Sequence, residues 1–278
     1  MKIREEVITS RANPTVKWAA SLSEKKGRAA ERAFIAEGEK LTREALAARL
    51  PVTHILLCES RARNILDSLL PLLSEQIYEN TEIITLSESA FSKISTEKAP
   101  QGVICVIKYL DFFNIIDIIY KEEFFLEKTE RALALYSLRD PGNLGAVIRS
   151  AVAFGVDHII LSADSADIYS PKTVRSAMGS LYRTKITVVG DFSSFIRAAQ
   201  NTGKRVFAAE LSEDAVSLND CGLRADDIVI IGNEGHGIPT EVSSACDGSV
   251  YIPISGKTES LNASVAAALF MWEQSKLD

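Results

Sequence analysis

The possible folds of this chain are limited most by a regular alternation of short apolar segments and longer amphipathic ones from residue 131 to the C-terminus. Six apolar segments are expected to form strands, at residues 132–138, 158–161, 185–189, 205–209, 228–231 and 250–254. Helices are expected between most of them, at residues 144–154, 173–178, 192–200 and 260–272. This alternation predicts an α/β fold with a mostly parallel sheet covered by helices on both faces. Ligands of such sheets bind beyond the carboxyl ends of the strands, so functional residues are expected directly after strands.

A second alternation precedes this one. A helix is expected over residues 9–22, with Pro14 in the first turn, where helices tolerate proline, and Lys25-Lys-Gly-Arg28 interrupts its apolar stripe. Further strands are expected at residues 33–38, 54–58, 82–86 and 102–107, with helices at 39–49, 63–73 and 87–94. This order predicts a separate small α/β domain.

The length of 278 residues suffices for two domains. We predict a first domain over residues 1–108 and a second over residues 131–278. Residues 109–130 are too rich in isoleucine and aromatic residues for a flexible linker, and are interpreted as a short helix or strand packed between the domains.

The composition indicates a cytoplasmic protein without a membrane segment or a metal site. No apolar run approaches the ~20 residues that cross a bilayer, and no apolar region follows the charged N-terminus as in a secretory leader. The cysteines lack metal-binding or disulfide spacing and are expected to be reduced thiols. They are Cys58, Cys105, Cys221 and Cys246.

The charge is unevenly distributed. The whole chain carries a net charge of −6. Residues 1–50 hold eleven Lys and Arg against seven Glu, a local excess of four, so the remainder stands at −10. A basic end on an acidic protein is consistent with a polyanionic partner, although a solvated helical surface explains the charge equally well.

The first segment of chemical interest follows the strand at residues 132–138. Asp140-Pro-Gly is typical of a turn, and Asn143 is expected to cap the next helix. Arg149 lies in the second turn of that helix, with Gly145 and Ala146 on the same face. Small residues beside an arginine leave room for a large, anionic ligand. The alternative is an ordinary strand-to-helix turn.

The second segment is Gly232-Asn-Glu-Gly-His-Gly237, directly after the strand at residues 228–231. Three glycines in six residues permit positive φ angles and close approach of a flat ligand to the backbone. Glu234 lies between two of these glycines, which favours a binding role over that of an ordinary exposed carboxylate.

The third segment, residues 250–273, carries a strand, a polar loop and a helix almost without polar residues. Ser260 is the expected N-cap of that helix, with Asn262 and Ser264 close behind it. A helix that is apolar all round is either buried on every face or covered by another subunit. The segment alone is also compatible with a capped core helix.

Together these three segments resemble the ordered motifs of the SpoU/TrmH-type RNA ribose 2′-O-methyltransferases of the SPOUT superfamily. Asp140-Pro-Gly-Asn-Leu-Gly-Ala with Arg149 is similar to the first motif, and Ile231-Gly-Asn-Glu-Gly-His-Gly-Ile to the second. Ile252-Pro-Ile, followed by Glu259-Ser-Leu-Asn-Ala-Ser-Val-Ala, is similar to the third. Ser170-Pro-Lys-Thr-Val-Arg-Ser-Ala resembles the linker of that family, with Ala177 where serine is commoner. Ser10–Lys17 and Phe34–Gly38 resemble its RNA substrate-binding domain.

The resemblance implies a deep trefoil knot in the second domain, a homodimer formed through that domain, and S-adenosylmethionine as the cofactor, with no metal. It also implies methylation of a ribose 2′-hydroxyl in structured RNA, with ribosomal RNA favoured over transfer RNA. The cofactor-binding residues implied in this way are Ala209, Glu210, Gly232, Asn233, Ile252 and Leu261. The implied catalytic residues are Arg149, Asn143, Glu234, Ser260 and Asn262. The expected RNA-binding residues are Arg11, Asn13, Lys17, Arg28 and Lys40.

Arg149 is expected near the ribose hydroxyl, either as a base or as an orienting cation. We favour orientation and electrostatic stabilisation, because a guanidinium barely deprotonates. A non-catalytic RNA-binding or ribosome-assembly protein with the same fold is the main alternative. A phosphate-hydrolysing α/β enzyme is disfavoured, since the sequence lacks a P-loop.

Overall fold

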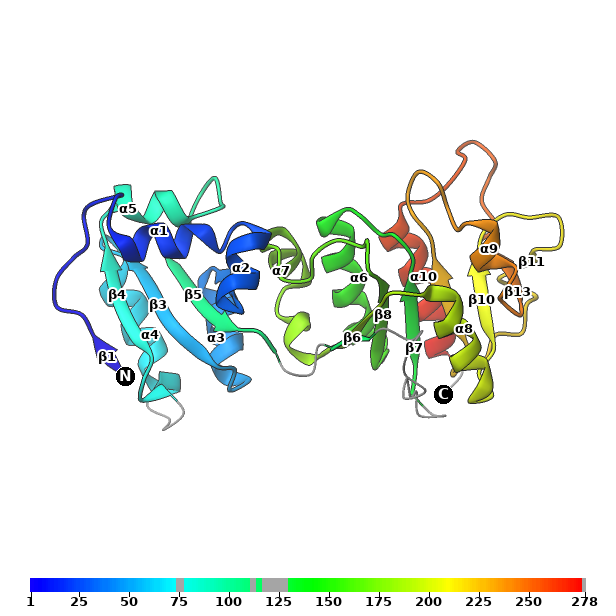
Figure 1. Ribbon diagram of the computed structural model, residues 1–278, viewed down its shortest axis with the longest axis horizontal. Helices are drawn as coiled ribbons and strands as arrows, with labels where there is room; N and C mark the ends of the chain where they lie inside the picture. The colour runs from blue at the N-terminus through cyan, green and yellow to red at the C-terminus, as the bar shows by residue number, and fades with distance from the viewer. Residues whose placement is uncertain (74–77, 111–113, 117–129, 277–278) are drawn as a thin grey trace. The chain divides into compact units, whose positions relative to one another are not determined.

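The computed structural model describes residues 1–73, 78–110, 114–116 and 130–276, which fall into two compact units (Figure 1). The first unit contains residues 1–110 and 167–182, and the second contains residues 111–166 and 183–278. Residues 167–182 therefore pack with the first unit, whereas the sequence-based division placed them in the second domain. Most of the segment 109–130, predicted as a short helix or strand between the domains, lies outside the described residues.

The described part of the first unit is built on a mixed sheet with the strand order β1-β4-β3-β5-β2. Strand β5 runs antiparallel to both β2 and β3, and the other pairs are parallel. The strands are β1 (Lys2–Ile3), β2 (Ala33–Glu37), β3 (Val52–Cys58), β4 (Glu82–Leu86) and β5 (Val103–Lys108). The apolar segments expected at residues 33–38, 54–58, 82–86 and 102–107 thus all form strands.

Helices cover both faces of this sheet (Figure 1). They are α1 (Pro14–Ser21), α2 (Lys25–Glu31), α3 (Glu39–Ala47), α4 (Ala62–Leu73) and α5 (Glu88–Ile94). Helices α1 and α5 enclose one apolar core with the sheet, while α3 and α4 pack together on the other face. Pro14 occupies the first turn of α1 as expected, and the Asn13 side chain accepts from the backbone N–H of Thr15 as its N-cap. The interruption predicted at residues 25–28 is instead helical. Gly27 lets this helix lie close to the end of α1, because a Cβ there would lie 2.1 Å from the Ser21 carbonyl oxygen.

Residues 167–182 form an integral part of the first unit. Helix α7 (Pro171–Ala177) lies against β2, and the Asp167 carboxylate forms a 2.6 Å ion pair with Arg28, whose side chain is 3% exposed. Tyr169 stacks on Tyr109 with ring centroids 4.1 Å apart, and its hydroxyl accepts a 3.0 Å hydrogen bond from the backbone N–H of Leu110. This buried ion pair and the stacked rings explain why the segment belongs to the first unit.

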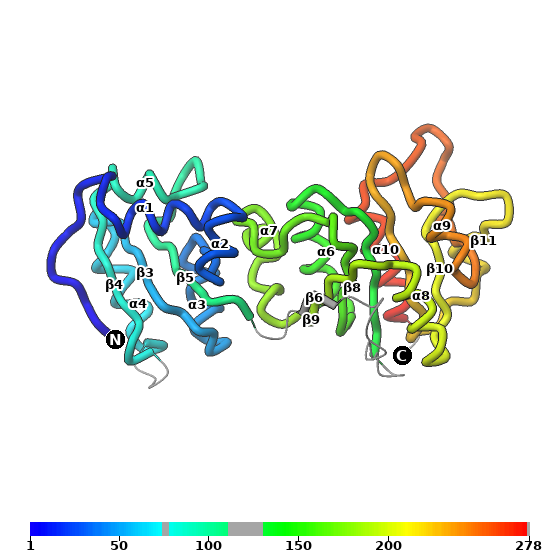
Figure 2. Tube along the Cα trace, in the orientation of Figure 1, coloured from blue at the N-terminus to red at the C-terminus, as the bar shows by residue number. Residues whose placement is uncertain are grey.

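The second unit, whose Cα trace is shown in Figure 2, is organised around a parallel sheet. Its described strands have the order β11-β13-β10-β12-β7-β8-β9-β6. The strands are β6 (Asn114–Ile116), β7 (Ala132–Leu135), β8 (His158–Ser162), β9 (Lys185–Val189), β10 (Val206–Ala209), β11 (Val216–Ser217), β12 (Ile228–Ile231) and β13 (Gly248–Tyr251). The predicted mostly parallel sheet is confirmed. From β7 the chain continues to one side through β8 and β9, then crosses to the other side at β10 and later places β12 directly beside β7. The carboxyl ends of β7 and β12 therefore form a topological switch point, where ligands of open α/β sheets bind.

Two layers of helices cover the sheet of the second unit. Helices α6 (Pro141–Ala153) and α10 (Ala263–Ser275) pack together on one face (Figure 1). Helix α8 (Phe192–Asn201) and the short α9 (Thr240–Ser243) contribute to an apolar layer on the other face. One of the two sequence-based alternatives required helix α10 to be buried on every face. It is not, because Val265 is 47% and Trp272 48% exposed.

None of the helices in the described part of the chain is long and apolar enough to cross a lipid bilayer.

Candidate active site

The loop after β7 presents Asn143 at the carboxyl end of the sheet. Asp140 is the N-cap of α6, since its side chain accepts a 2.8 Å hydrogen bond from the backbone N–H of Asn143. The expectation that Asn143 itself caps this helix is therefore wrong. Aspartate caps as well as asparagine and stands just before Pro141, the first helical residue. The Asn143 side chain is thus left to make other contacts, and its Nδ2 donates a 3.0 Å hydrogen bond to Glu234.

The turn after β12 presents Glu234. Asn233 and Gly237 exchange two backbone hydrogen bonds of 3.0 Å, which close the turn. Gly232 has no room for a side chain, because a Cβ there would lie 2.6 Å from the Gly237 carbonyl carbon. The sequence pattern that singled out these glycines thus reflects a tight turn, with Glu234 exposed at its tip.

The beginning of α10 presents Asn262. Its Oδ1 accepts from the backbone N–H groups of Ser264 and Val265, so Asn262 and not Ser260 is the N-cap. The prediction of Ser260 as the cap is wrong because both residue types cap well, and the chain leaves the loop two residues later than expected. The Nδ2 of Asn262 donates a 3.1 Å hydrogen bond to Asn143. Hydrogen bonds therefore link Asn262, Asn143 and Glu234, one residue from each of the three segments.

A cavity of about 1100 Å³ lies beside these three hydrogen-bonded side chains, between the loops that follow β10, β12 and β13. All of the residues predicted to bind the cofactor line it: Ala209, Glu210, Gly232, Asn233, Ile252 and Leu261. Glu234 and Ser260 line it as well, whereas Asn143, Asn262 and Arg149 are not among its lining residues. The sequence interpretation missed further lining residues. They include Leu211, Tyr251, Ile254, Lys257 and Phe270, of which Leu211 and Tyr251 could have been found because Tyr251 ends β13 and Leu211 lies two residues after β10.

Arg149 lies on α6 with its side chain exposed. Within the described residues it makes no hydrogen bond and no ion pair, so its guanidinium donors are available to a ligand. Gly145 is buried and Ala146 half-buried. Packing therefore occupies much of the space that the small residues were expected to leave open.

A cluster of polar side chains around Asp164 stabilises the loop after β7. The Asp164 carboxylate accepts hydrogen bonds from Ser137, Ser162 and Arg139, at 2.6, 2.7 and 3.1 Å. Burial alone raises the pKa of Asp164, but these hydrogen bonds outweigh it and hold the pKa below its usual value. Asp164 is consequently a carboxylate at neutral pH and keeps the cluster in place.

The residues predicted to bind RNA lie in the first unit and differ in their availability. Arg11, Lys17 and Lys40 are exposed, whereas Asn13 uses its side-chain oxygen to cap α1. Arg28 contradicts the prediction. It is buried, and besides its ion pair with Asp167 it donates to the carbonyl oxygens of Leu22 and Ser23. Lysine and arginine content reports charge but not burial, which is why the sequence counted Arg28 as a surface cation.

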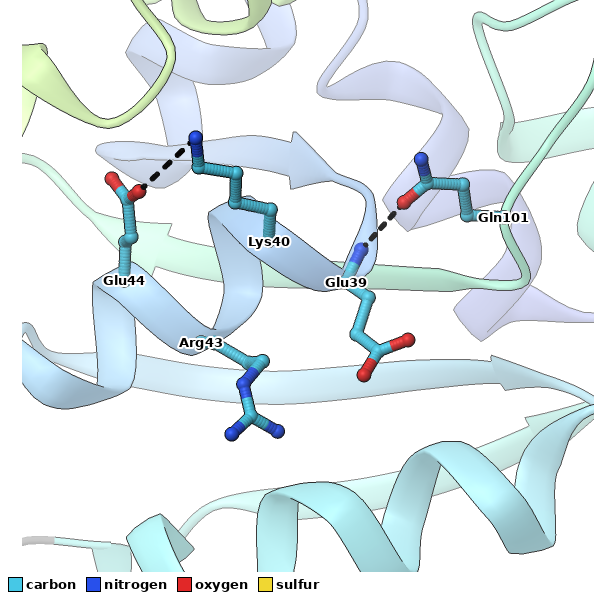
Figure 3. Close-up of a pocket in the computed structure, with 5 residues that line it drawn as sticks. All are labelled: Glu39, Lys40, Arg43, Glu44 and Gln101. Atoms are coloured by element: carbon cyan, nitrogen blue, oxygen red, sulfur yellow. Dashed lines mark hydrogen bonds and ion pairs between the residues drawn. The ribbon is translucent and has the colours of Figure 1, made fainter.

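Lys40 also lines a surface hollow of about 480 Å³ on α3, with Glu39, Arg43, Glu44 and Gln101 (Figure 3). Figure 3 shows its ammonium directed at the Glu44 carboxylate, 3.9 Å away, and Gln101 accepting from the backbone N–H of Glu39. Equal numbers of acidic and basic side chains make this hollow a poorer anion site than the surface around Arg11 and Lys17. Elsewhere in the described parts of both units, no group of three His, Cys, Asp or Glu residues is placed to hold a metal ion.

Comparison with known proteins adds a family to this geometry. Residues 130–272 match the SpoU rRNA methylase family. The chain is 30% identical to the 23S rRNA (guanosine(2553)-2′-O)-methyltransferase RlmP of Bacillus subtilis, over 95% of this chain and 97% of that protein. The chain belongs to the SpoU rRNA methylase family. The family predicted from the three motifs is thereby confirmed.

Other matches extend this result to the first unit and to the fold. Residues 13–105 match the MRM3-like substrate binding domain. The chain is 27% identical to the 23S rRNA (uridine(2479)-2′-O)-methyltransferase of Streptomyces viridochromogenes, over 96% of this chain and 90% of that protein. It is also similar to the AdoMet-bound rRNA methyltransferase of Sinorhizobium meliloti, with a TM-score of 0.80, 27% identity and coverage of 99% and 98% of the two chains. The α/β fold preceded by a small α/β domain is thus confirmed, and the knot is expected of the chain as a member of this family.

Proposed function

We propose that this protein transfers a methyl group from S-adenosylmethionine to a ribose 2′-hydroxyl of ribosomal RNA. The observation that carries the proposal is the hydrogen-bonded series Asn262, Asn143 and Glu234, which joins the loops after β7 and β12 at the switch point and lies beside the 1100 Å³ cavity. Membership in the SpoU family and relatives named as 23S rRNA 2′-O-methyltransferases support the reaction class and the substrate.

The cavity suits the cofactor in size and in chemistry. Its 1100 Å³ lies just above the upper end of the range of roughly 300–1,000 Å³ for ligand sites, which combine apolar walls with a few polar groups. Ile252, Leu261 and Phe270 supply apolar surface for a purine, and Glu210, whose carboxylate accepts a 2.8 Å hydrogen bond from Ser249, supplies an acceptor for ribose hydroxyls. When bound there, S-adenosylmethionine supplies an electrophilic methyl group.

The protein's own contribution is to hold and polarise the RNA ribose. Arg149 is exposed and free of partners within the described structure, so its donors can hold an RNA phosphate and stabilise charge that develops on the 2′-oxygen. Glu234 is fixed by its hydrogen bond from Asn143 and lies in the cavity wall, where it can accept a hydrogen bond from the nucleotide. Positioning of the reacting groups then supplies much of the rate.

The test uses the purified full-length protein, radiolabelled S-adenosylmethionine, and separate ribosomal and transfer RNA from a strain that lacks the gene. Alkaline hydrolysis maps the product, because a 2′-O-methyl group blocks cleavage of the adjacent phosphodiester bond. We expect label at a defined nucleotide of ribosomal RNA. Calorimetry with a chelator present should give one cofactor site per chain. RNA binding without cofactor binding or methyl transfer would instead support the non-catalytic alternative.

A further inference from the structure

The side chain of Asn233 holds two loops together. Its Nδ2 donates a 2.8 Å hydrogen bond to the backbone carbonyl of Ser137, in the loop after β7. Its Oδ1 accepts from the backbone N–H groups of Gly235 and His236, at 2.9 and 3.1 Å, in the turn after β12. The Nδ1 of His236 also lies 3.2 Å from this oxygen. An amide oxygen has two lone pairs, so these contacts use its accepting capacity.

The partner of Asn233 in the other loop is held in an unusual conformation. Ser137 is a buried non-glycine residue with a φ of 54°. This left-handed conformation is uncommon for residues other than glycine, and it persists where the surrounding contacts enforce it. Here Ser162 accepts a 2.7 Å hydrogen bond from the Ser137 N–H, and Asp164 accepts one from the Ser137 hydroxyl. Residues of this kind concentrate at functional sites.

The two ends of this arrangement lead to the proposed active site. Three residues beyond Ser137, Asp140 caps α6 and so fixes the position of Asn143. One residue beyond Asn233, Glu234 accepts the hydrogen bond from Asn143. The same two loops are therefore joined twice, by Asn233 and Ser137 at their base and by Asn143 and Glu234 at their tips.

We infer that Asn233 is a positioning residue for methyl transfer, which aligns Glu234 with Asn143 by fastening its turn to the Ser137 carbonyl. Its oxygen is occupied within the turn, so the role assigned to its side chain is to hold the loops, although the residue also lines the cavity. This role differs from the one implied by the resemblance, in which Asn233 is a cofactor-binding residue. The rate measurements that test this inference rest on the proposed function. The measurement of cofactor affinity is independent of methyl transfer.

The decisive variant is Asn233→Asp. The carboxylate keeps the acceptor for Gly235 and His236 but loses the donor to the Ser137 carbonyl. It therefore removes the hydrogen bond between the two loops and preserves the turn. We expect kcat to fall on the order of 10²-fold, because small misplacements of reacting groups have effects of that size. The Kd for S-adenosylmethionine, measured by calorimetry, should change less than about threefold. Asn219→Asp, an exposed asparagine on the same unit, is the matched control for the added charge and should behave as wild type.

A second variant tests the same hydrogen bond through the residues that hold Ser137 in place. Asp164→Asn weakens the cluster that holds Ser137 without altering any residue of the cavity wall. It should lower kcat and spare cofactor affinity, as Asn233→Asp does. It also keeps the inference testable if Asn233→Asp is poorly folded, which thermal melting and cofactor binding will reveal.

A double-mutant cycle separates positioning from a general structural defect. If Asn233 acts through the Asn143–Glu234 hydrogen bond, Asn233→Asp should have little further effect on kcat once Asn143 has been replaced by alanine. Multiplicative losses in the double variant would overturn the inference. A tenfold or greater loss of cofactor affinity in Asn233→Asp would do so as well, since it would make the side chain a cofactor contact. Unchanged kcat and cofactor affinity would show that the hydrogen bond between Asn233 and Ser137 is dispensable.

Discussion

The Nδ2 of Asn262 donates a 3.1 Å hydrogen bond to the Oδ1 of Asn143, across 119 positions of sequence. The same Asn262 caps α10 through its own oxygen, so one side chain both begins a helix and connects to the loop after β7. Two of the motifs are thus joined through a group that also stabilises the fold, and the two roles can be separated by mutation.

Asn262→Asp should separate the capping role of Asn262 from its hydrogen bond to Asn143. The carboxylate preserves the acceptor for the N–H groups of Ser264 and Val265, and aspartate caps a helix as well as asparagine does. It removes the donor to Asn143 and should lower the rate of methyl transfer at near-normal thermal stability. Asn262→Ala, in contrast, should also lose about 1 kcal/mol of stability with the cap. Thermal melts beside single-turnover assays distinguish the variants, and an unimpaired rate in Asn262→Asp would show that the link to Asn143 is not used.

Arg149→Ala should abolish most methyl transfer and leave cofactor affinity largely intact. The residue is outside the cavity wall, and loss of one electrostatic group at a transition state costs ~10²–10³ in rate. Arg149→Lys should rescue little, because an ammonium lacks the planar fork of the guanidinium. Arg197→Ala, an exposed arginine on α8, is the control. Near-normal single-turnover rates in both Arg149 variants would remove this residue from the mechanism.

The double variant Arg11→Gln/Lys17→Gln should weaken RNA binding and flatten its salt dependence. Both side chains are exposed on the basic first unit, and each phosphate contact adds roughly 0.7–0.9 to the slope of log K against log salt. Arg197→Gln/Arg224→Gln removes two exposed charges from the second unit and serves as the comparison. Filter binding across a salt series measures both. Equal slopes in the two double variants would locate the RNA contacts elsewhere.

The protein is expected to be a homodimer through the second unit, with α6 and α10 near the interface. Val265 and Trp272 are exposed on α10, and their spacing of seven residues places them on one side of the helix. Burial of these apolar side chains by a second copy would stabilise the dimer. Light scattering should give the dimer mass at micromolar concentration, and Val265→Glu/Trp272→Glu should shift it towards the monomer. A monomer mass for the unaltered chain would contradict this expectation.

The buried ion pair between Arg28 and Asp167 should dominate the stability of the segment 167–182. Arg28→Met leaves a carboxylate without its partner, and such a change costs about 3–5 kcal/mol. Arg175→Met, which breaks the more exposed ion pair with Glu97, should cost no more than ~1 kcal/mol. Chemical denaturation compares the two. Equal losses would mean that burial does not set the strength of the Arg28 pair.

Sequence patterns predicted the sheets better than the ends of their elements. The runs at residues 158–161, 185–189 and 228–231 became β8, β9 and β12, because continuous β-branched segments are favourable only when buried in a sheet. The strand predicted at residues 132–138 ends instead at Leu135, and the turn that follows requires the left-handed conformation of Ser137. The identity of a serine does not predict that conformation, since it depends on contacts with Ser162, at the end of the next strand, and with Asp164 just beyond it.

The site was predictable as a list of residues but not as a set of roles. Glycines and polar residues after strands pointed to the right loops, because parallel strands end on the same edge of the sheet. Asn143 and Ser260 were both assigned as caps, and the structure gives those positions to Asp140 and Asn262. Arg28 looked like any other basic residue, although Asp167, 139 positions away, makes it part of the core. Such assignments depend on long-range contacts, which one sequence does not display.

The packing of residues 167–182 against β2 bears on how this protein can evolve. Those residues lie inside the stretch that matches the SpoU rRNA methylase family, yet they complete the unit whose other part matches a substrate binding domain. A recombination event at a single point near residue 108 would separate α7 from the strand on which its buried Val174 and Ala177 rest. Exchange of the recognition domain as one cassette is therefore unfavourable. New RNA targets are more readily reached by substitutions on its surface, while the two interleaved stretches of the gene are inherited together.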